Sequence, residues 1–199
     1  MSNQRFYLGS RSPRRRELLA LAGYSYAELP VGAADVDETP MADEPAVDYV
    51  TRVAREKAAM GWRAVIAGGL ATLPVLTADT TVVVDDAIIG KPDNAAHAGE
   101  MLRRLSGRVH TVLTAVALAS AHGVTTRLST STVEFRDITT AEIERYVASG
   151  EPFDKAGAYA IQGRAAIFIR AISGSYSGIM GLPLFETAEL LGSLGITPD

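Results

Sequence analysis

The segment at residues 78–92, ADTTVVVDDAIIGKP, constrains the fold more than any other part of this chain. Its valines and isoleucines predict two short strands that are joined by a turn at Asp85 and Asp86. Asp79 stands where the apolar strand is expected to begin, and a carboxylate there costs free energy unless another group pairs with it. Lys91 returns to the same end if the strands pair antiparallel. The hairpin therefore predicts an acid and a base together at one edge of a sheet, a suitable place for chemistry on an anionic substrate.

The rest of the chain mixes alternating helices and strands with one long β-hairpin. Helices are predicted at residues 12–23, 44–60, 94–105, 139–147 and 183–194, strands at 5–9, 25–31, 108–120, 124–135 and 165–172, a linker at 61–72 and a loop at 151–163. This order predicts an α/β fold with a mixed, twisted central sheet that is flanked by helices, and two lobes around a cleft. A chain of 199 residues is expected to form a single domain over residues 1–199.

The predicted start of the first helix is unusually basic. Ser12 is a good N-cap residue and Pro13 suits the first helical position, but Arg14, Arg15 and Arg16 follow directly. Cations are unfavourable at the partly positive helix N-terminus unless an anion is expected there. A serine-rich turn with free N–H groups and arginines predicts a phosphate site, although a solvated basic helix start explains the tripeptide equally well. The apolar residues that follow, Leu18, Leu19 and Leu21, are expected to face inward.

Lys57 lies beside the apolar stripe of the helix expected at residues 44–60. Its ammonium can extend outward to solvent along the apolar surface, or it can point into a cleft. The helical periodicity does not choose between the two.

The composition excludes several kinds of site. The chain has no cysteine, so it has no disulfide, thiol nucleophile or thiolate metal site, which is consistent with a reducing cytoplasm. Its net charge of −4 disfavours binding to a nucleic-acid polymer. The sequence contains no run of about 18 apolar residues for a membrane span. Its first residues lack the apolar stretch of a signal peptide. We therefore expect a cytoplasmic protein that binds neither nucleic-acid polymers nor membranes.

The side chains that remain available for chemistry are carboxylates and cations. His97, His110 and His122 are not spaced as a metal cluster, and no Walker-type or GxGxxG motif is present. The candidates are Glu38, Asp79, Asp154, Lys57, Lys91, Lys155, Arg14 and Arg15. Carboxylate oxygens suit Mg²⁺ or Mn²⁺, and arginine and lysine suit phosphate. This combination predicts phosphoryl chemistry assisted by a divalent metal cation.

Seven ordered blocks of the chain resemble the Maf family of nucleoside triphosphate pyrophosphatases. They are LGSRSPRRRELL, DVDE, AREKA, ADTTVVVDDAIIGKP, LSGRVHTVLTAVAL, DKAGAYAIQG and GSYSGIMGLPLFET. The resemblance implies metal-dependent hydrolysis of the α–β bond of a nucleoside triphosphate, and a fold similar to that of the inosine triphosphate pyrophosphatases. It implies Asp79 as the catalytic acid or base, aided by Lys57 and Lys91. It further implies Glu38 as a metal ligand with Asp79, and Ser10, Arg14 and Arg15 as triphosphate contacts.

Three positions place the chain in one branch of that family by resemblance. Arg14 stands in place of tryptophan, Thr80 in place of glutamine and Gln162 in place of glutamate, a set that resembles the dTTP/UTP pyrophosphatases. The amide of Gln162 offers a donor and an acceptor to a pyrimidine edge, whereas a glutamate would only accept. The opening SRSPRRR departs slightly from the usual alanine–serine pattern.

Two other functions stay open at this stage. One keeps the chemistry but changes the base, to 7-methyl-GTP or a non-canonical purine nucleoside triphosphate. The other is a nucleotide-binding regulator of septum formation, which binds without turnover. The resemblance also suggests removal of modified nucleotides, a link to cell-division arrest and a homodimer, as in many family members.

Overall fold

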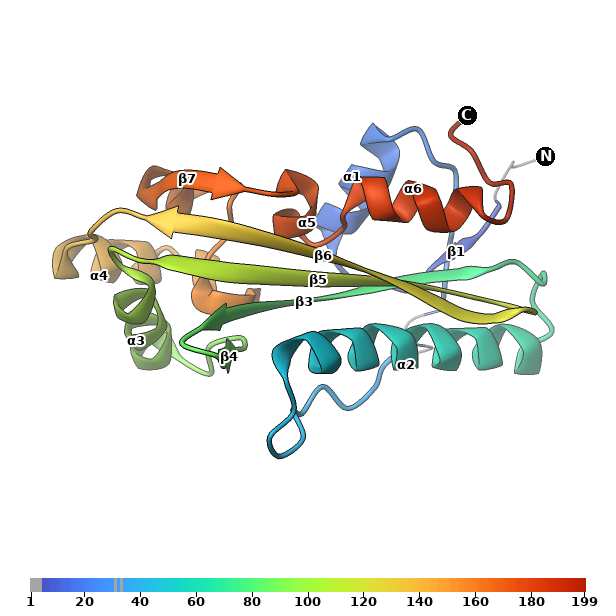
Figure 1. Cartoon of the computed structure of the whole chain (residues 1–199), viewed down its shortest axis with the longest axis horizontal. Coiled ribbons are helices and arrows are strands. Elements are labelled where there is room, and N and C mark those ends of the chain that lie inside the picture. Colours follow the sequence, from blue (N-terminus) through green and yellow to red (C-terminus); the bar gives the residue numbers. More distant parts are fainter. Residues whose placement is uncertain (1–4, 31, 33) are drawn as a thin grey trace.

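A mixed, twisted sheet forms the centre of the protein (Figure 1). The computed structural model describes residues 5–30, 32 and 34–199. In this part of the chain, seven strands pair in the order β2-β1-β3-β5-β6-β7, and β4 also pairs with β3. The strands are β1 (Tyr7–Leu8), β2 (Ala27–Glu28), β3 (Val75–Val84), β4 (Ala87–Ile89), β5 (Val109–Ser120), β6 (Gly123–Phe135) and β7 (Ile169–Ser173). The β1 pairs are parallel and the other pairs antiparallel, so the predicted mixed sheet is confirmed.

Helices cover both faces of this sheet. They are α1 (Pro13–Leu21), α2 (Ala46–Ala67), α3 (Ala95–Leu105), α4 (Thr140–Ala148), α5 (Tyr176–Met180) and α6 (Leu184–Gly192), with short 3-10 helices η1 (Glu151–Asp154), η2 (Ala156–Ala158) and η3 (Arg164–Phe168). On one face, Val50 and Val53 of α2 pack against Leu113 and Ala115 of β5. On the other face, α1 and α6 pack against β1, β3 and β5 (Figure 1). None of the helices that the structure describes is long and apolar enough to cross a membrane.

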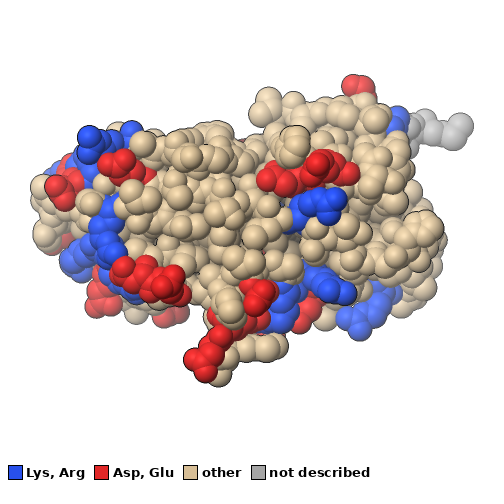
Figure 2. Space-filling model, viewed as in Figure 1, with Lys and Arg blue, Asp and Glu red and all other residues tan. Residues whose placement is uncertain are grey.

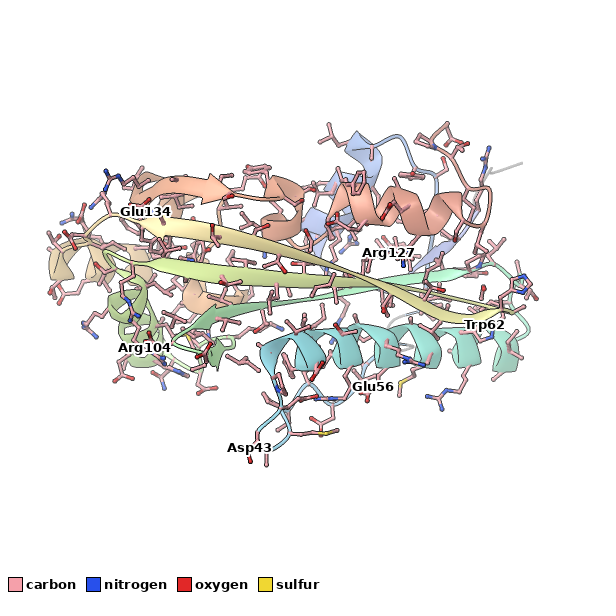
Figure 3. All side chains as sticks on the ribbon, viewed as in Figure 1. Asp43, Glu56, Trp62, Arg104, Arg127 and Glu134 are labelled. Atoms are coloured by element: carbon pink, nitrogen blue, oxygen red, sulfur yellow. The ribbon has the colours of Figure 1, made fainter. Side chains whose placement is uncertain are left out.

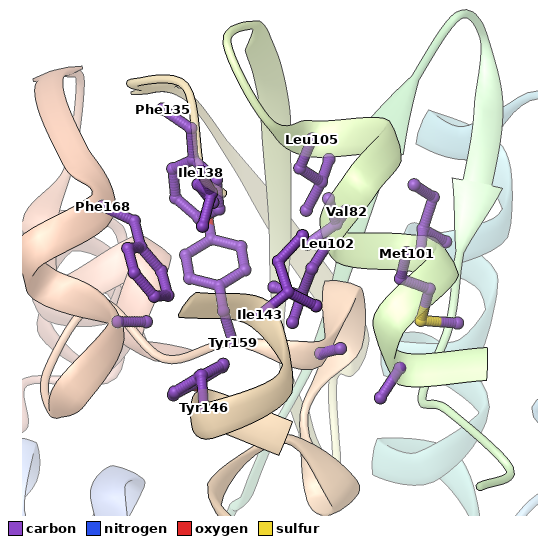
Figure 4. Packing of buried hydrophobic residues seen from close by; sticks show 14 of the residues in the cluster. Val82, Met101, Leu102, Leu105, Phe135, Ile138, Ile143, Tyr146, Tyr159 and Phe168 are labelled. Atoms are coloured by element: carbon purple, nitrogen blue, oxygen red, sulfur yellow. The ribbon is translucent and has the colours of Figure 1, made fainter. Parts of the chain in front are cut away.

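A second group of helices lies at the other end of the long strands. There, α3, α4 and the 3-10 helices surround an aromatic cluster that includes Phe135, Tyr146, Tyr159 and Phe168 (Figure 4). The ring of Tyr159 meets that of Phe135 edge-on, with 4.8 Å between their centroids. The two groups of helices, joined by the long strands, correspond to the two lobes that the sequence predicts.

Along one edge of β3, pairing with neighbouring strands is interrupted near the middle of the strand. On that side, β1 pairs with Val75 and Leu76, and β4 pairs from Val82 onward. Residues 77–81 lie between the two ladders, so no described strand pairs with them on this side. The gap contains Asp79 and Thr80, the residues at which the sequence predicts chemistry.

The position expected for Asp79 at the start of a strand at the edge of the sheet is wrong. The strand already begins at Val75, because the apolar residues before Asp79 pair with β1 and β5. Asp79 is therefore the fifth residue of β3 and only 7% of it is exposed. The turn at Asp85 and Asp86 is confirmed, since both residues adopt positive φ angles of 51° and 58° between β3 and β4.

The linker expected at residues 61–72 is partly wrong, because α2 continues to Ala67. Gly61 lies inside the helix, where an added Cβ would come 2.9 Å from both Leu29 Cδ2 and Val75 Cγ1. The glycine thus allows the helix to approach the strands closely. Helix propensity, which disfavours glycine, does not predict that the helix continues here. Leu21 was expected to face inward, but it is 80% exposed.

Two further boundaries differ from the sequence prediction. The strand expected at residues 165–172 begins only at Ile169, after the 3-10 helix η3. Of the strand expected at residues 25–31, only Ala27 and Glu28 pair with β1, and Val31 lies outside the described residues. The loop expected at residues 151–163 contains the short helices η1 and η2.

Candidate active site

The gap along β3 opens into a cleft of about 1020 Å³. Its size is at the upper end of that of typical small-molecule sites. Every site residue that the sequence predicts lines this cleft: Ser10, Arg14, Arg15, Glu38, Lys57, Asp79, Thr80, Lys91, Asp154, Lys155 and Gln162. The structure thus brings together residues from both groups of helices around the centre of β3.

Lys57 joins the two carboxylates of the cleft. Its Nζ lies 2.8 Å from Asp79 Oδ1 and 2.6 Å from Glu38 Oε1. On the other side of Glu38, Lys91 Nζ lies 3.9 Å from Oε2. The ammonium of Lys57 therefore points into the cleft, which decides between the two orientations that the sequence left open. Lys91 and Asp79 both line this cleft, and the pair of Lys57 and Glu38 connects them: Asp79 contacts Lys57, and Lys91 approaches Glu38.

A hydrogen bond between strand and helix places Asp79 against Lys57. The hydroxyl of Thr77 donates to the carbonyl of Ala54 at 2.8 Å. Thr77 and Asp79 lie two residues apart on one face of β3, and Ala54 and Lys57 lie three residues apart on one face of α2. The Thr77–Ala54 contact therefore holds the two elements in the register that brings the ammonium to the carboxylate.

Burial and the neighbouring cations shift the two carboxylates in opposite directions. Burial raises the pKa of Asp79, and Lys57 only partly offsets this effect. Burial also opposes ionisation of Glu38, but the hydrogen bond and charge of Lys57, with Lys91 and Arg15, outweigh it and lower the pKa. The directions of the two shifts make Asp79 the carboxylate with the greater tendency to accept a proton.

The start of α1 forms a cationic wall of the cleft. Arg15 Nε donates to the carbonyl of Gly181 at 2.7 Å, and its Nη1 donates to Ser10 Oγ at 3.2 Å. Burial lowers the pKa of Arg15, while Asp79 and Glu38 oppose that shift. Arg14 and Arg16 also line the cleft, and Arg16 pairs there with Glu28 at 3.2 Å.

No acidic residue lies in the first turn of α1. Ser12 is its N-cap residue, but in the described structure its hydroxyl oxygen accepts no capping hydrogen bond from an N–H of the helix. The helix N-terminus thus carries positive charge and N–H groups, which suit an anion.

Thr80 and Gln162 also line the cleft. The hydroxyls of Thr80 and Thr114 lie 3.0 Å apart, and Thr114 donates to the carbonyl of Gly178 at 2.7 Å. Gln162 is exposed, and its amide has no hydrogen-bond partner among the described residues. Asp154 and Lys155 pair with each other on the same wall.

The sequence did not point to the residues that hold the Glu38 loop. Tyr49 donates its hydroxyl to the carbonyl of Glu38 at 2.9 Å, and Arg52 donates to the carbonyl of Thr39 at 3.1 Å. Burial, with the charges of Asp79 and Glu38, raises the pKa of Tyr49 to about 12, so its phenol stays a donor. Tyr49 and Arg52 are three residues apart on one helix face, which was the only hint in the sequence. Because both bind backbone carbonyls, no particular side chain elsewhere in the sequence identifies their partners.

The three histidines lie on separate parts of the fold, His97 on α3, His110 on β5 and His122 before β6, and His97 is one of the residues that line the cleft. His110 Nε2 lies 2.7 Å from the hydroxyl of Tyr159, and burial lowers the pKa of this histidine to about 4. His97 Nδ1 lies 3.0 Å from Asp93 on the surface, and His122 is in an exposed turn. The described residues contain no group of three or more histidines or carboxylates that could hold a metal ion by itself.

The two carboxylates of the cleft fit a hard divalent cation as a partial ligand set. Glu38 and Asp79 already converge on one cation, the ammonium of Lys57, and both offer oxygen ligands. Mg²⁺ is commonly held by one or two carboxylates, with water and substrate phosphates as the other ligands.

Figure 2 shows charges of both signs interspersed over one face of the protein, and Figure 3 shows Glu56 on α2 and Arg104 on α3.

Comparison with known proteins identifies the family. Residues 5–194 match the family model described as Maf-like protein. The chain belongs to the Maf family. This Maf protein is 55% identical over 192 residues to the dTTP/UTP pyrophosphatase of Nitrosospira multiformis, a match that covers 94% of the chain and 93% of the relative. The dTTP/UTP pyrophosphatases of Nitrosomonas europaea and Chromobacterium violaceum are 55% and 50% identical, with at least 95% of each chain covered.

Among solved structures, the Maf protein is similar to the Ham1 protein of Staphylococcus aureus. The TM-score is 0.49 and the sequence identity 12%, over 95% of this chain and 96% of the other. The family resemblance seen in the seven sequence blocks is confirmed by the family match and by the relatives.

Proposed function

We propose that this Maf protein hydrolyses dTTP and UTP to the nucleoside monophosphate and pyrophosphate. The observation that carries the proposal is the buried Asp79, which Lys57 holds at 2.8 Å in a cleft that Arg15 and Lys91 also line. Such a set provides a proton acceptor beside cations that suit phosphate. The related dTTP/UTP pyrophosphatases supply the substrate class.

Asp79 orients a water molecule towards the α-phosphorus and accepts one of its protons. The water oxygen forms a bond to that phosphorus, and the bond to the oxygen that bridges the α- and β-phosphorus breaks. The electron pair of the broken bond leaves with pyrophosphate. Since its pKa is raised by burial, Asp79 is a stronger base than an exposed aspartate.

The cations of the cleft bind the triphosphate and offset the charge that develops on the leaving group. Lys57 and Lys91 approach the catalytic carboxylates, and Arg14, Arg15 and Ser10 approach from the start of α1. Such preorganised donors stabilise developing charge in a partly buried site. Because pyrophosphate held by cations is a good leaving group, no covalent intermediate is needed.

Glu38 and Asp79 are the residues that would hold Mg²⁺ or Mn²⁺. A bound divalent cation supplies a Lewis acid that neutralises phosphate charge. Lys57 keeps both carboxylates at the same place in the cleft. This ammonium limits the repulsion between two anions that the site needs close together.

Thr80 and Gln162 are the proposed contacts to the base. The free amide of Gln162 offers one donor and one acceptor, which match the N3–H and carbonyl groups of thymine and uracil. Thr80 lies next to Asp79 on β3, so the same strand positions both the reaction chemistry and a base contact.

The test is a panel of nucleoside triphosphates with analysis of the products. We expect dTTP and UTP to be the best substrates, and the products to be monophosphate and pyrophosphate. Release of the nucleoside diphosphate and inorganic phosphate would contradict the assignment of the α–β bond as the one that breaks. A preference for 7-methyl-GTP or another purine nucleotide would contradict the base assignment, and tight binding of dTTP without turnover would instead favour a regulator of septum formation.

We also propose that residues 1–199 act as one domain, because both groups of helices contribute to the same cleft. A cytoplasmic location would place the enzyme with its nucleotide substrates. Limited proteolysis tests the domain assignment, since a stable fragment that retained turnover would contradict it.

A further inference from the structure

Glu151 forms a second polar cluster in the wall that carries Gln162. Its two carboxylate oxygens each accept the backbone N–H of Arg164 at 3.1 Å, and Oε1 also accepts the hydroxyl of Tyr146 at 3.0 Å. Its backbone carbonyl accepts Lys155 Nζ at 2.6 Å. One residue thus connects α4, η1 and the start of η3.

The backbone directly after Gln162 lies against this carboxylate. Gly163 has φ 136° and ψ −157°, a conformation that is almost restricted to glycine. A Cβ on Gly163 would lie 2.6 Å from Glu151 Oε1, so the close approach also requires glycine. The amide of Gln162 has no hydrogen-bond partner among the described residues. The backbone beside Glu151 therefore sets the position from which the side chain of Gln162 extends.

Tyr146 attaches the carboxylate of Glu151 to the apolar core. The tyrosine is 4% exposed, and its ring meets that of Phe168 edge-on at 5.5 Å, in the cluster that Figure 4 shows. Burial raises the pKa of Tyr146, and the charge and hydrogen bond of Glu151 raise it further, although the backbone of Ala160 opposes the shift. The phenol therefore stays protonated and donates to Glu151.

We propose that Glu151 is a positioning residue that sets the choice of base through Gln162, without touching the nucleotide. This inference rests on the proposed function, in which Gln162 contacts the base. The residues proposed to bind phosphate come from other parts of the chain: the start of α1, the helix α2 and the segment directly after β4. None of them is hydrogen-bonded to the Glu151 carboxylate. A defect at Glu151 should therefore weaken recognition of the base and leave recognition of the triphosphate unchanged.

The experiment compares Glu151→Gln and Tyr146→Phe with the control Glu144→Gln, which changes an exposed carboxylate on α4, the helix that carries Tyr146. The full chain is titrated calorimetrically, with Mg²⁺ present, with two probes: the α,β-methylene analogue of dTTP and inorganic tripolyphosphate. For Glu151→Gln we expect about tenfold weaker binding of the dTTP analogue, the effect of a lost charged hydrogen bond, and unchanged binding of tripolyphosphate. Tyr146→Phe should show a smaller loss of the same kind, and Glu144→Gln none.

Steady-state kinetics adds a readout that a general loss of structure would not give. In Glu151→Gln, the KM for dTTP should rise while kcat changes little, and the ratio of kcat/KM between dTTP and ITP should fall. Equal losses for both probes would show a structural role and overturn the proposal, as would unchanged binding of the dTTP analogue in both variants. If Glu151→Gln does not fold, Tyr146→Phe decides in the same way.

The wild-type protein separates this inference from the proposed function. If wild type binds the dTTP analogue no better than tripolyphosphate, or releases no pyrophosphate from dTTP, the proposed function fails, and this inference fails with it. If wild type selects dTTP but Glu151→Gln selects it equally well, only the role of Glu151 is wrong.

Discussion

The ammonium of Lys57 lies 2.8 Å from the carboxylate of Asp79, although the two residues come from different layers of the fold. Lys57 belongs to α2 and Asp79 to the central strand β3, and the Thr77–Ala54 hydrogen bond holds these elements together. A carboxylate that is only 7% exposed needs such a partner. The same pair therefore stabilises the buried carboxylate in the sheet and lies in the cleft where the reaction is proposed.

The first prediction concerns turnover. Asp79→Asn keeps the shape of the side chain but removes the base, so kcat for dTTP should fall by about 10²- to 10⁴-fold at saturating Mg²⁺. Pyrophosphate release measures this loss. The control is Asp86→Asn, an exposed turn position with φ 58° that asparagine tolerates. Turnover of Asp79→Asn near that of wild type would remove Asp79 from its proposed role.

The second prediction follows from the raised pKa of Asp79. Between the unfolded pKa and the higher folded pKa, the folded protein binds more protons than the unfolded chain, so its stability falls as pH rises. Asp79→Asn lacks this titration. The free energy of unfolding of Asp79→Asn minus that of wild type should therefore increase from pH 4 towards neutral pH. Urea denaturation with EDTA present measures it, and a difference that stays constant or decreases with pH would contradict the prediction.

The features that the sequence predicted well are encoded by neighbouring residues. The turn at Asp85 and Asp86 and the hairpin of β5 and β6 follow from local composition. The helix α4 begins with a full capping box between Thr139 and Glu142, a signal that needs only four residues. The set of cleft residues was recognised from ordered blocks along the chain, and all of them line one cleft.

The features that the sequence missed depend on contacts between distant segments. Asp79 lies in the middle of a strand because β1 and β5 pair with the residues before it. The helix α2 contains Gly61 because Leu29 and Val75 leave no room for a side chain at this position. Tyr49 holds Glu38 through a backbone carbonyl, a group that every residue carries and that no sequence pattern can identify. None of these contacts between distant segments can be inferred from the local periodicity of the sequence.

The third prediction tests the support of the Glu38 loop. Arg52 holds Glu44 through two hydrogen bonds of 2.6 and 2.8 Å, and it also donates to the carbonyl of Thr39. In Arg52→Gln the loop loses these contacts, so the Mg²⁺ concentration for half-maximal turnover should rise about tenfold. Arg55→Gln, an exposed change on the same helix, is the control. An unchanged Mg²⁺ requirement in Arg52→Gln would show that the loop does not depend on Arg52.

Arg52→Gln should also change the response to acid. The hydrogen bonds from Arg52 and from the Met41 backbone lower the pKa of Glu44 to about 2. A lowered folded pKa contributes stability that is present above the unfolded value and is lost as pH falls towards 2. The stability of wild type should therefore fall more steeply below about pH 4.5 than that of Arg52→Gln. Parallel acid-unfolding curves would mean that Arg52 does not set this titration.

The fourth prediction concerns the base. Gln162→Glu replaces the donor of the amide with a second acceptor, so it loses the match to a pyrimidine carbonyl. We expect kcat/KM for dTTP to fall about 10- to 100-fold, mainly through KM. Gln162→Ala separates the loss of the amide from the added charge, since only the glutamate should repel carbonyl oxygens. A dTTP preference that both variants retain would show that the amide does not contact the base.

The fifth prediction compares two glycines of the wall that carries Gln162. Gly157 and Gly150 have similar φ angles of 70° and 77°, but a Cβ on Gly157 would lie 2.9 Å from Val82, whereas Gly150 has open space. Gly150→Ala should cost about 1 kcal/mol from backbone strain alone, and Gly157→Ala about 2–4 kcal/mol because overpacking adds to it.

Urea denaturation measures both variants, and their difference isolates the effect of packing. The Gly157 N–H also donates to the carbonyl of Gly90 at 3.0 Å, directly before Lys91. The clash should therefore displace the end of the β3–β4 hairpin, and the KM for dTTP should rise in Gly157→Ala but not in Gly150→Ala. Equal stability losses would mean that Val82 yields to the added methyl group. An unchanged KM for dTTP in Gly157→Ala, despite a larger loss of stability than in Gly150→Ala, would show that the contact between Gly157 and Gly90 does not position Lys91.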